Sequence, residues 1–427
     1  MLFGKKLSTE PYKGVRDFYP EDKAIQRYIF DIWSETAESF GYEPYDASVL
    51  EPAELYRSKT SDEIVNEQTY TFIDRGEREV TLRPEMTPTV ARMIAGKRRD
   101  LTFPVRWYSI PNLFRYERPQ RGRLREHWQL NCDIFGADDY SADVEIISLA
   151  YHMLLNFGAE PSMFEIRVNN RALMESWYVE KFKLTAESIK AITRLVDRKN
   201  KVSAEEFKQS LKEVVDDTDA LIAGLGTPDP ATLSGEHSLQ AVIAALKELG
   251  ITNVRFDASL ARGFDYYTGT IFEIFDTSSE NNRSLLGGGR YDNLTALFGG
   301  DKISGIGFGM GDVTMRDFLE THGLLTNTIT TAPVLMVVPT EAAYNIEGQK
   351  VAEGFRAHGI ATAVDISSKK IGKKISDASG KFVEYILVVG ENEVQTQKFT
   401  LKHLESGKEY TGELHELAHV IDDTPHI

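Results

Sequence analysis

The chain has 427 residues, 41% of them hydrophobic, and a net charge of −16 at pH 7. This length and hydrophobic content predict two or three folded domains and exclude a mainly disordered protein. The negative charge argues against indiscriminate nucleic-acid binding, which depends on neutralising phosphates. Any nucleic acid must therefore contact local basic patches.

The single cysteine, Cys132, excludes an internal disulfide and a cysteine-based metal cluster. Its expected role is that of a small buried side chain. The N-terminal residues lack the apolar core of a signal peptide, and no stretch approaches the roughly 18 apolar residues that a membrane span requires. We therefore expect a cytoplasmic location and no membrane partner.

The first predicted elements are a helix and a hairpin. Apolar residues at helical spacing between Ile25 and Trp33 predict a helix that ends near Gly41. Residues 69–85 indicate a hairpin that turns around Asp74 to Glu77.

A second helix is predicted directly after this hairpin, with Thr87 as its N-cap and Pro88 as its first residue. On the strand before it, Arg83, Glu85 and Thr87 would point the same way. A cation, an anion and a hydroxyl would then lie together at a strand end.

A basic loop between two strands comes next. Its five arginines fall within eleven residues: Arg115, Arg118, Arg121, Arg123 and Arg125. Guanidinium groups bind phosphate oxygens in a bidentate manner, so this loop suits a polyphosphate, although a solvated hairpin tip is the alternative.

The returning strand should have one polar face and one core face. Gln129, Asn131 and Asp133 alternate with apolar residues, and side chains alternate between the faces of a strand. The polar face would suit a small polar substrate beside the polyphosphate.

Residues 171 to about 250 change character and predict a helical insertion. Ile189, Ile192 and Val196 recur at helical spacing, and Ser203 with Glu206 has the pattern of a capping box.

Strands resume after the insertion and include an unusual glycine tract. Gly305, Gly307, Gly309 and Gly311 occupy every second position, so one strand face has no side chains. Such a face lets something flat approach the backbone, and a closely packed strand is the alternative. Asp312 is expected to cap the helix that follows.

The C-terminal residues predict a small α/β domain with mostly parallel strands, because short unbroken apolar runs alternate with helices. One of these helices carries four lysines: Lys369, Lys370, Lys373 and Lys374.

Taken together, these segments resemble the histidyl-tRNA synthetases, a family of class II aminoacyl-tRNA synthetases, across nearly the entire chain. KGVRDFYPED resembles the amino-terminal signature, TLRPEMTPTVAR the amino-acid-binding strand and helix, and FRYERPQRGRLREHWQLNCDIFG class motif 2. ARGFDYYTGTIFE and GGGRYD resemble the two histidine-specific signatures.

The resemblance implies an α+β catalytic domain over residues 1–325, with an antiparallel sheet flanked by helices and the helical insertion. A linker at residues 326–332 and an anticodon-binding α/β domain at residues 333–427 would follow. It also implies a homodimer formed through motif 1, and two-step chemistry with ATP, Mg²⁺, histidine and tRNA(His). No residue is assigned as a metal ligand.

The resemblance also implies residue roles. Arg115 and Arg262 would be the catalytic pair, converging on the α-phosphate where the substrate carboxylate attacks. The predicted histidine-binding residues are Glu85, Thr87, Gln129, Asp133, Tyr266, Tyr267 and Tyr291, with Asp133 and Tyr267 at the imidazole. Tyr266 and Tyr267 also fit an aromatic pair in the core.

The predicted ATP-binding residues are Arg115, Glu117, Arg123, His127, Gly309, Gly311 and Thr314. Thr314 departs from the family pattern, because motif 3 usually has an arginine there for the γ-phosphate. Lys302, Arg123 or Arg125 could supply that charge. Milder departures are Ser48 in motif 1, His127 at the adenine-stacking position, and Asp133 where a glutamate is common.

For the tRNA, the resemblance predicts that Arg118, Gln120 and Arg121 touch the acceptor end and that the four lysines contact the anticodon arm. A solvated lysine face is the alternative for the latter.

The departure at Thr314 leaves open a second function, that of a catalytically silent paralogue that binds histidine and regulates another enzyme.

Overall fold

The computed structural model describes residues 7–57, 68–120, 122–199, 202–226, 239–261, 266–281, 283–326 and 329–422. The chain divides into two compact units, residues 1–17 with 28–324 and residues 18–27 with 325–427. Each unit has its own hydrophobic core.

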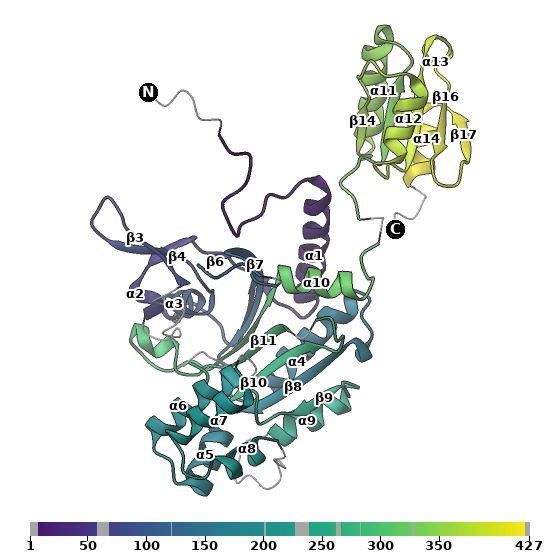
Figure 1. Cartoon of the computed structure of the whole chain (residues 1–427). Coiled ribbons are helices and arrows are strands. Elements are labelled where there is room, and N and C mark those ends of the chain that lie inside the picture. Colours follow the sequence, from purple (N-terminus) through teal and green to yellow (C-terminus); the bar gives the residue numbers. More distant parts are fainter. Residues whose placement is uncertain are drawn as a thin grey trace. The chain divides into compact units, whose positions relative to one another are not determined.

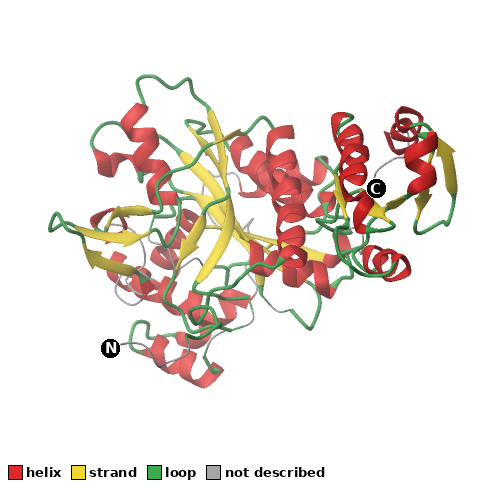
Figure 2. Cartoon of the chain, turned by 90° about the horizontal axis from the view of Figure 1, so that it is seen from above, coloured by secondary structure: helices red, strands yellow, loops and turns green. Residues whose placement is uncertain are grey.

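A nine-stranded sheet forms the centre of the first unit (Figures 1 and 2). Its strand order is β1 (Glu43–Pro44), β5 (Val105–Ser109), β7 (Glu126–Phe135), β12 (Gly305–Gly311), β11 (Ser284–Arg290), β10 (Thr270–Asp276), β8 (Phe164–Asn170) and β9 (Val254–Phe256), and β6 (Asn112–Phe114) also pairs with β7.

The six strands from β5 to β8 pair antiparallel with one another, which confirms the predicted antiparallel sheet for this part. The two edge strands differ from that prediction, because β1 pairs with β5 and β9 pairs with β8 in parallel.

Helices and a small second sheet surround this core. The helices are α1 (Pro20–Ser39), α2 (Glu54–Arg57), α3 (Thr87–Lys97), α4 (Ser141–Asn156) and α10 (Asp312–Thr321). The hairpin of β3 (Tyr70–Ile73) and β4 (Glu79–Leu82) turns at Asp74 to Glu77 as expected, and β2 (Leu50–Pro52) completes its sheet. Both α4 and α10 contact β7 and β12, so these two helices help to hold the central strands in place.

The predicted starts of two helices are wrong by one residue. Helix α3 begins at Thr87 itself, and Met86 occupies the N-cap without a capping hydrogen bond. Helix α10 begins at Asp312, whose carboxylate instead accepts hydrogen bonds from Arg16 at 2.6 Å and from the backbone of Trp128 at 3.0 Å. Tertiary partners thus take the place of a local cap.

The predicted insertion is helical. It contains α5 (Arg171–Phe182), α6 (Ala186–Arg198), α7 (Ala204–Lys212), α8 (Thr218–Gly226) and α9 (Leu239–Glu248). Ser203 caps α7 by accepting the backbone N–H of Glu206 at 3.2 Å. Helices α5 to α8 share a core of their own that includes Ile192, Leu211 and Leu221, and they lie together in Figure 1.

The second unit contains the predicted α/β domain. Its sheet has the order β14 (Thr362–Val364), β13 (Leu335–Pro339), β15 (Tyr385–Val389), β16 (Phe399–His403) and β17 (Glu409–Gly412), accompanied by α11 (Asn345–Ala357), α12 (Ile371–Ser379), α13 (Glu391–Thr396) and α14 (Leu414–Asp422). The first three strands are parallel, and β16 and β17 continue the sheet antiparallel.

Short 3-10 helices occur at Pro161–Met163, Thr295–Phe298 and Ala342–Tyr344. Among the helices that the structure describes, none is long and apolar enough to span a membrane.

Candidate active site

Two adjoining cavities are lined by β7, β11 and β12 of the large sheet. The small cavity, of about 90 Å³, is lined by Glu85, Thr87, Arg115, Gln129, Asn131, Tyr266, Tyr267, Gly287, Tyr291, Gly307, Phe308 and Gly309. The large cavity, of about 590 Å³, includes Arg115, Glu117, Gln120, Gly122, Arg123, His127, Gln129, Glu273, Arg283, Gly287, Gly309, Gly311 and Thr314. Four residues, Arg115, Gln129, Gly287 and Gly309, line both and mark the junction.

The small cavity is walled by tyrosines that hold one another in place. Tyr266 donates its hydroxyl to the buried carboxylate of Glu85 at 3.1 Å. Its ring lies 4.8 Å from that of Tyr267 and 5.9 Å from that of Tyr291, measured between centroids. The tyrosine pair therefore packs in the core, as one of the two predictions has it, and also lines the cavity, while its predicted contact with histidine stays a prediction.

Asp133 lies just behind this wall. It is 3% exposed and accepts a hydrogen bond from the hydroxyl of Tyr291. Burial raises the pKa of Asp133 to about 7, and the Tyr291 hydrogen bond offsets part of that rise. The pair is thus a buried, titratable polar group next to the cavity.

The bare face of β12 lies against the side chains of β7. Gly307 pairs with Asp133, Gly309 with Asn131 and Gly311 with Gln129 in the sheet register. A Cβ at Gly307 would overlap the Asp133 carboxylate, and one at Gly309 would lie 2.7 Å from Cδ of Gln129. The glycine tract is therefore a closely packed strand that lets polar side chains of the neighbouring strand lie across it.

Arg115 stands at the junction of the two cavities. Its Nε donates to the carbonyl oxygen of Pro84 at 2.8 Å. This bond orients the side chain, and the guanidinium lines both cavities. One charge can therefore act on groups bound in either cavity.

His127 lines the large cavity as a neutral ring. Burial, together with the positive charges of Arg115 and Arg16, lowers the pKa of His127 to about 3. A neutral imidazole offers a flat face that can stack on an aromatic base.

The motif 2 loop forms a tight turn at the edge of the large cavity. Gln120 and Arg123 exchange backbone hydrogen bonds at 2.9 and 3.0 Å, and Gly122 between them has φ +73°, a value that favours glycine. The guanidinium of Arg123 is paired with Glu117 at 3.1 Å.

Thr314 contributes no charge to the large cavity. Its hydroxyl donates to the carbonyl oxygens of Gly311 at 3.0 Å and Leu285 at 3.1 Å. Of the substitutes suggested by the sequence, only Arg123 lines either cavity. Arg125 instead stacks on Tyr116, with Cζ 3.9 Å from the ring centroid, and Lys302 is exposed.

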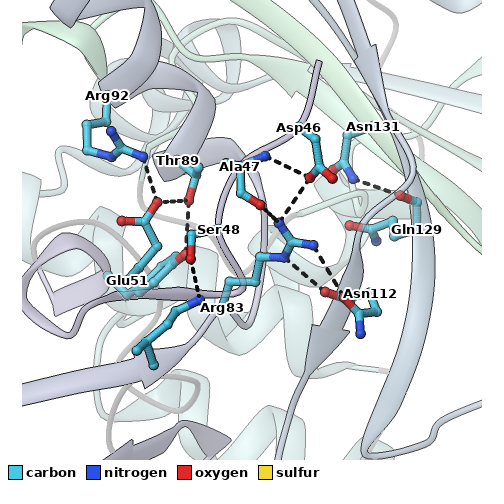
Figure 3. A network of polar contacts seen from close by, with 12 residues as sticks. Asp46, Ala47, Ser48, Glu51, Arg83, Thr89, Arg92, Asn112, Gln129 and Asn131 are labelled. Carbon is cyan, nitrogen blue, oxygen red and sulfur yellow. Dashed lines mark hydrogen bonds and ion pairs between the residues drawn. The ribbon is translucent and has the colours of Figure 1, made fainter. Parts of the chain in front are cut away.

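The predicted alignment of Arg83, Glu85 and Thr87 is wrong for Arg83. Glu85 and Thr87 line the small cavity, but the buried Arg83 guanidinium turns to the loop before β2. It donates to the carbonyl oxygens of Ala47 at 2.7 Å and Asn112 at 3.0 Å (Figure 3). Strand β4 ends at Leu82, so the strict alternation of side chains along a strand no longer applies at Arg83. The Arg83 side chain can therefore connect β6 to that loop.

A second polar group in this region fixes helix α3. Glu51 accepts hydrogen bonds from Thr89 at 3.2 Å and from Arg92 at 2.7 Å (Figure 3). Because Thr87 begins the same helix, this contact helps to hold Thr87 at the small cavity. Ser48, one of the departures in motif 1, accepts the backbone N–H of Leu50 at 3.2 Å.

Two predicted site residues, Arg262 and Arg121, lie outside the described residues. The predicted convergence of Arg115 and Arg262 is therefore not tested. Arg118 and Gln120 are exposed on the motif 2 loop.

The lysines of α12 and its approach do not form one surface. Lys369 and Lys373 are exposed and both pair with Asp377 at 2.7 Å. Lys374 is 4% exposed and donates to the carbonyl oxygens of Pro339 and Asp365. The prediction that Lys374 contacts phosphates is therefore wrong, because this ammonium group holds the fold of its own unit.

The polar cavity residues that were not assigned as site residues from the sequence include Asn131, Glu273 and Arg283. Asn131 could have been found, because it shares a strand face with Gln129. Glu273 and Arg283 reach the large cavity through the pairing of β10, β11 and β12, which no local pattern reveals.

Among the described residues, no group of His, Cys, Asp and Glu side chains forms a ready metal site.

Comparison with known proteins places this geometry in context. The family model for histidyl-tRNA synthetase matches residues 14–312, and that for an anticodon binding domain matches residues 334–424. The chain is 42% identical to a histidine–tRNA ligase of Leptospira biflexa, over 95% of this chain and 96% of that protein. It is 38% identical to a histidine–tRNA ligase of Thermoplasma volcanium, over 94% and 96%.

A solved structure agrees with these sequence matches. The crystal structure of apo S. aureus histidyl-tRNA synthetase superposes with a TM-score of 0.73 at 26% identity, covering 98% of this chain and all of that one. The shared fold therefore extends to both units of the chain, and not to the central sheet alone.

Proposed function

Because the chain belongs to the histidyl-tRNA synthetase family, we propose that it activates histidine with ATP and then transfers histidine to the 3′ end of tRNA(His). The first step yields histidyl-adenylate and pyrophosphate. The activity is that of an ATP-dependent histidine–tRNA ligase. The observation that carries this proposal is a small polar cavity joined to a large basic one, with Arg115 at their junction.

The junction is where the two substrates would react. In the first step a carboxylate oxygen attacks the α-phosphorus, and negative charge spreads over the phosphate oxygens. A fixed guanidinium stabilises that charge without any proton transfer. Arg115 fits this role because it lines both cavities, and Arg262 is proposed to join it.

The small cavity is proposed to bind histidine. Glu85, Thr87 and Gln129 would hold the ammonium end, and Asp133 with Tyr267 would recognise the imidazole, with Tyr266 and Tyr291 lining the pocket. A buried polar group left unpaired by a wrong amino acid costs about 1–3 kcal/mol. The buried Asp133 carboxylate already accepts the Tyr291 hydroxyl, and a ring N–H of histidine would be a further donor to it that most other amino acids lack.

The large cavity is proposed to bind ATP. His127 would stack on the adenine, while Glu117, Arg123, Gly309, Gly311 and Thr314 would contact the rest of the nucleotide. Mg²⁺ sites on nucleotides use one or two carboxylates together with the phosphates. Glu117 and Glu273 are carboxylates that line this cavity and fit that requirement, and the ion would neutralise charge on the phosphates.

A regulatory, catalytically silent paralogue is the less favoured alternative. The relatives that match over 94–95% of this chain are named histidine–tRNA ligases, and the chain carries the anticodon-binding domain. A protein that only senses histidine would not need that domain.

The tRNA contacts, the assembly and the location belong to the same proposal. Arg118, Gln120 and Arg121 would touch the acceptor end, and Lys369, Lys370 and Lys373 the anticodon arm. We further propose that the protein is a homodimer, works in the cytoplasm, and divides at a linker of residues 326–332.

The proposal is tested by histidine-dependent exchange of labelled pyrophosphate into ATP by the purified protein, followed by aminoacylation of tRNA(His). Exchange should require histidine and should not occur with other amino acids. Absence of exchange, with histidine binding retained, would favour the regulatory paralogue.

The division of labour is tested by removing residues 333–427. Aminoacylation should weaken far more than adenylate formation, because only the second substrate contacts that domain. Equal loss of both activities would refute the division.

A further inference from the structure

Arg283 lies directly before β11 and lines the large cavity. Among the residues that the structure describes, its guanidinium forms no ion pair and no hydrogen bond. The two other arginines among the described residues of the cavity wall differ, since Arg115 donates to Pro84 and Arg123 is paired with Glu117. Within the described part of the chain, Arg283 is thus a positive charge in the cavity wall without a neutralising partner.

Arg283 and Thr314 approach the same point of the motif 2 loop. A Cβ built on Gly122 would lie 3.3 Å from Cδ and 3.5 Å from Nη1 of Arg283, and 3.7 Å from Cγ2 of Thr314. Because the Thr314 hydroxyl is turned to the carbonyl oxygens of Gly311 and Leu285, it adds no charge there. Arg283 places a guanidinium on the side of the cavity where Thr314 has none.

The junction between the cavities indicates which part of a nucleotide Arg283 would meet. Arg115 lines both cavities, so the α-phosphorus lies beside it if the amino acid occupies the small cavity. Arg283 lines only the large cavity. It is therefore available to the phosphates beyond the α-phosphorus, and Arg123 shares its charge with Glu117 at 3.1 Å.

We propose that Arg283 binds the β- and γ-phosphates of ATP and thereby supplies the charge that Thr314 does not. In the reaction, a carboxylate oxygen of histidine forms a bond to the α-phosphorus, and the bond from that phosphorus to the bridging oxygen breaks. The electron pair leaves on pyrophosphate, where Arg283 offsets the charge. This inference rests on the proposed function and adds a residue to it.

The test is Arg283→Gln in the full chain, measured by histidine-dependent pyrophosphate exchange. Loss of a hydrogen-bonded charge of this kind should raise the KM for ATP and for pyrophosphate by roughly tenfold to a hundredfold. The KM for histidine and the affinity for AMP should change less than about twofold, because neither ligand extends to Arg283. Arg316→Gln is the matched control, since Arg316 pairs with Glu320 at 2.8 Å farther along α10.

A relocation experiment separates a phosphate contact from a structural role. In the double variant Arg283→Ser with Thr314→Arg, a guanidinium returns to the same corner from α10 instead of β11, and the KM for ATP should recover at least in part. If the wild type catalyses exchange and Arg283→Gln has the same KM for ATP and for pyrophosphate, this inference is wrong and the proposed function stands.

The inference is also wrong if Arg283→Gln raises the KM for histidine as much as the KM for ATP and the double variant restores neither. If the wild type itself catalyses no exchange, the proposed function fails as well.

Discussion

The small and the large cavity share a wall but are built in different ways. The small cavity is surrounded by buried groups that already satisfy one another, such as Glu85 with Tyr266 and Asp133 with Tyr291. The large cavity is lined by charges on a loop and on strand ends, among them Arg123 and Arg283.

Because of this difference, we expect residues of the large cavity to be replaceable more freely than those around the small cavity. A hydrogen-bond partner inside a packed wall must sit at one place, because the neighbouring backbone leaves no room for another arrangement. A charge that acts on phosphates can come from any side chain that reaches them. The departure at Thr314, in the large cavity, removes a charge, whereas the departure at Asp133, beside the small cavity, keeps a carboxylate at the same position.

The strongest test of the contrast is Gly307→Ala in the small cavity. Its Cβ would overlap the Asp133 carboxylate and lie 2.6 Å from the carbonyl oxygen of Cys132, so the strand or the carboxylate must move. A displacement of about 1 Å in an active site can cost about a hundredfold in rate, and we expect at least that loss in pyrophosphate exchange.

Gly96→Ala is the control, because a Cβ on this residue of α3 would meet nothing within 4 Å. It should leave exchange unchanged. Normal histidine activation by Gly307→Ala would show that the small cavity is not rigid.

Asp133→Asn tests the buried acid through stability. The pKa of Asp133 is about 7 in the folded protein against 3.8 for an ordinary aspartate, so folding favours its protonated form. Its contribution to stability is fully present below about pH 4 and is lost as the pH rises to about 7. Relative to wild type, Asp133→Asn should therefore gain roughly 2–3 kcal/mol between pH 5 and pH 8 in urea unfolding, at about 1.4 kcal/mol per pKa unit.

Tyr291→Phe sharpens that test. The Tyr291 hydrogen bond lowers the pKa of Asp133, so its removal should extend the pH-dependent loss of stability to higher pH. Parallel pH profiles for wild type and Asp133→Asn would contradict the assignment of a raised pKa to this residue.

The fold was largely predictable from local patterns. Alternating polar residues gave β7, and helical spacing gave the insertion. The parallel edge strands β1 and β9 were not predictable, because they span two and three residues and show no periodicity.

Site residues that lie within sequence motifs were predictable, and residues that strand pairing brings together were not. Asp133 and Tyr291 are 158 residues apart, and only the sheet brings them together. No local sequence pattern predicts that Arg283 lies at the large cavity. Its position there depends on the pairing of β11 with β12 and on the hydrogen bond from Thr314 to Leu285. Lys374 was misjudged because a run of lysines does not show which ammonium group turns inward.

In the large cavity, replacement of His127 should have a moderate effect. Stacking of a base on a planar side chain contributes about 1–3 kcal/mol, so His127→Ala should raise the KM for ATP by roughly fivefold to 150-fold, while His127→Phe should retain most of the affinity. Because the pKa of His127 is about 3, the ring stays neutral from pH 5 to pH 8, and this contribution should not vary with pH. A difference between wild type and His127→Phe that grows as the pH falls would contradict a neutral stacking ring.

The smallest effect is expected far from both cavities, at Lys369 and Lys373. Both pair with Asp377, which already offsets part of their charge, and both are exposed, so salt screens them. The double replacement by Gln should raise the KM for tRNA in aminoacylation by roughly twofold to fivefold at low salt and leave pyrophosphate exchange unchanged. Lys402→Gln serves as the matched control, because Lys402 is a partly exposed lysine of the same unit that pairs with Glu409 at 2.8 Å. If Lys402→Gln raised the tRNA KM as much as the double variant, the effect would come from the net charge of the unit, and α12 would lose its proposed role.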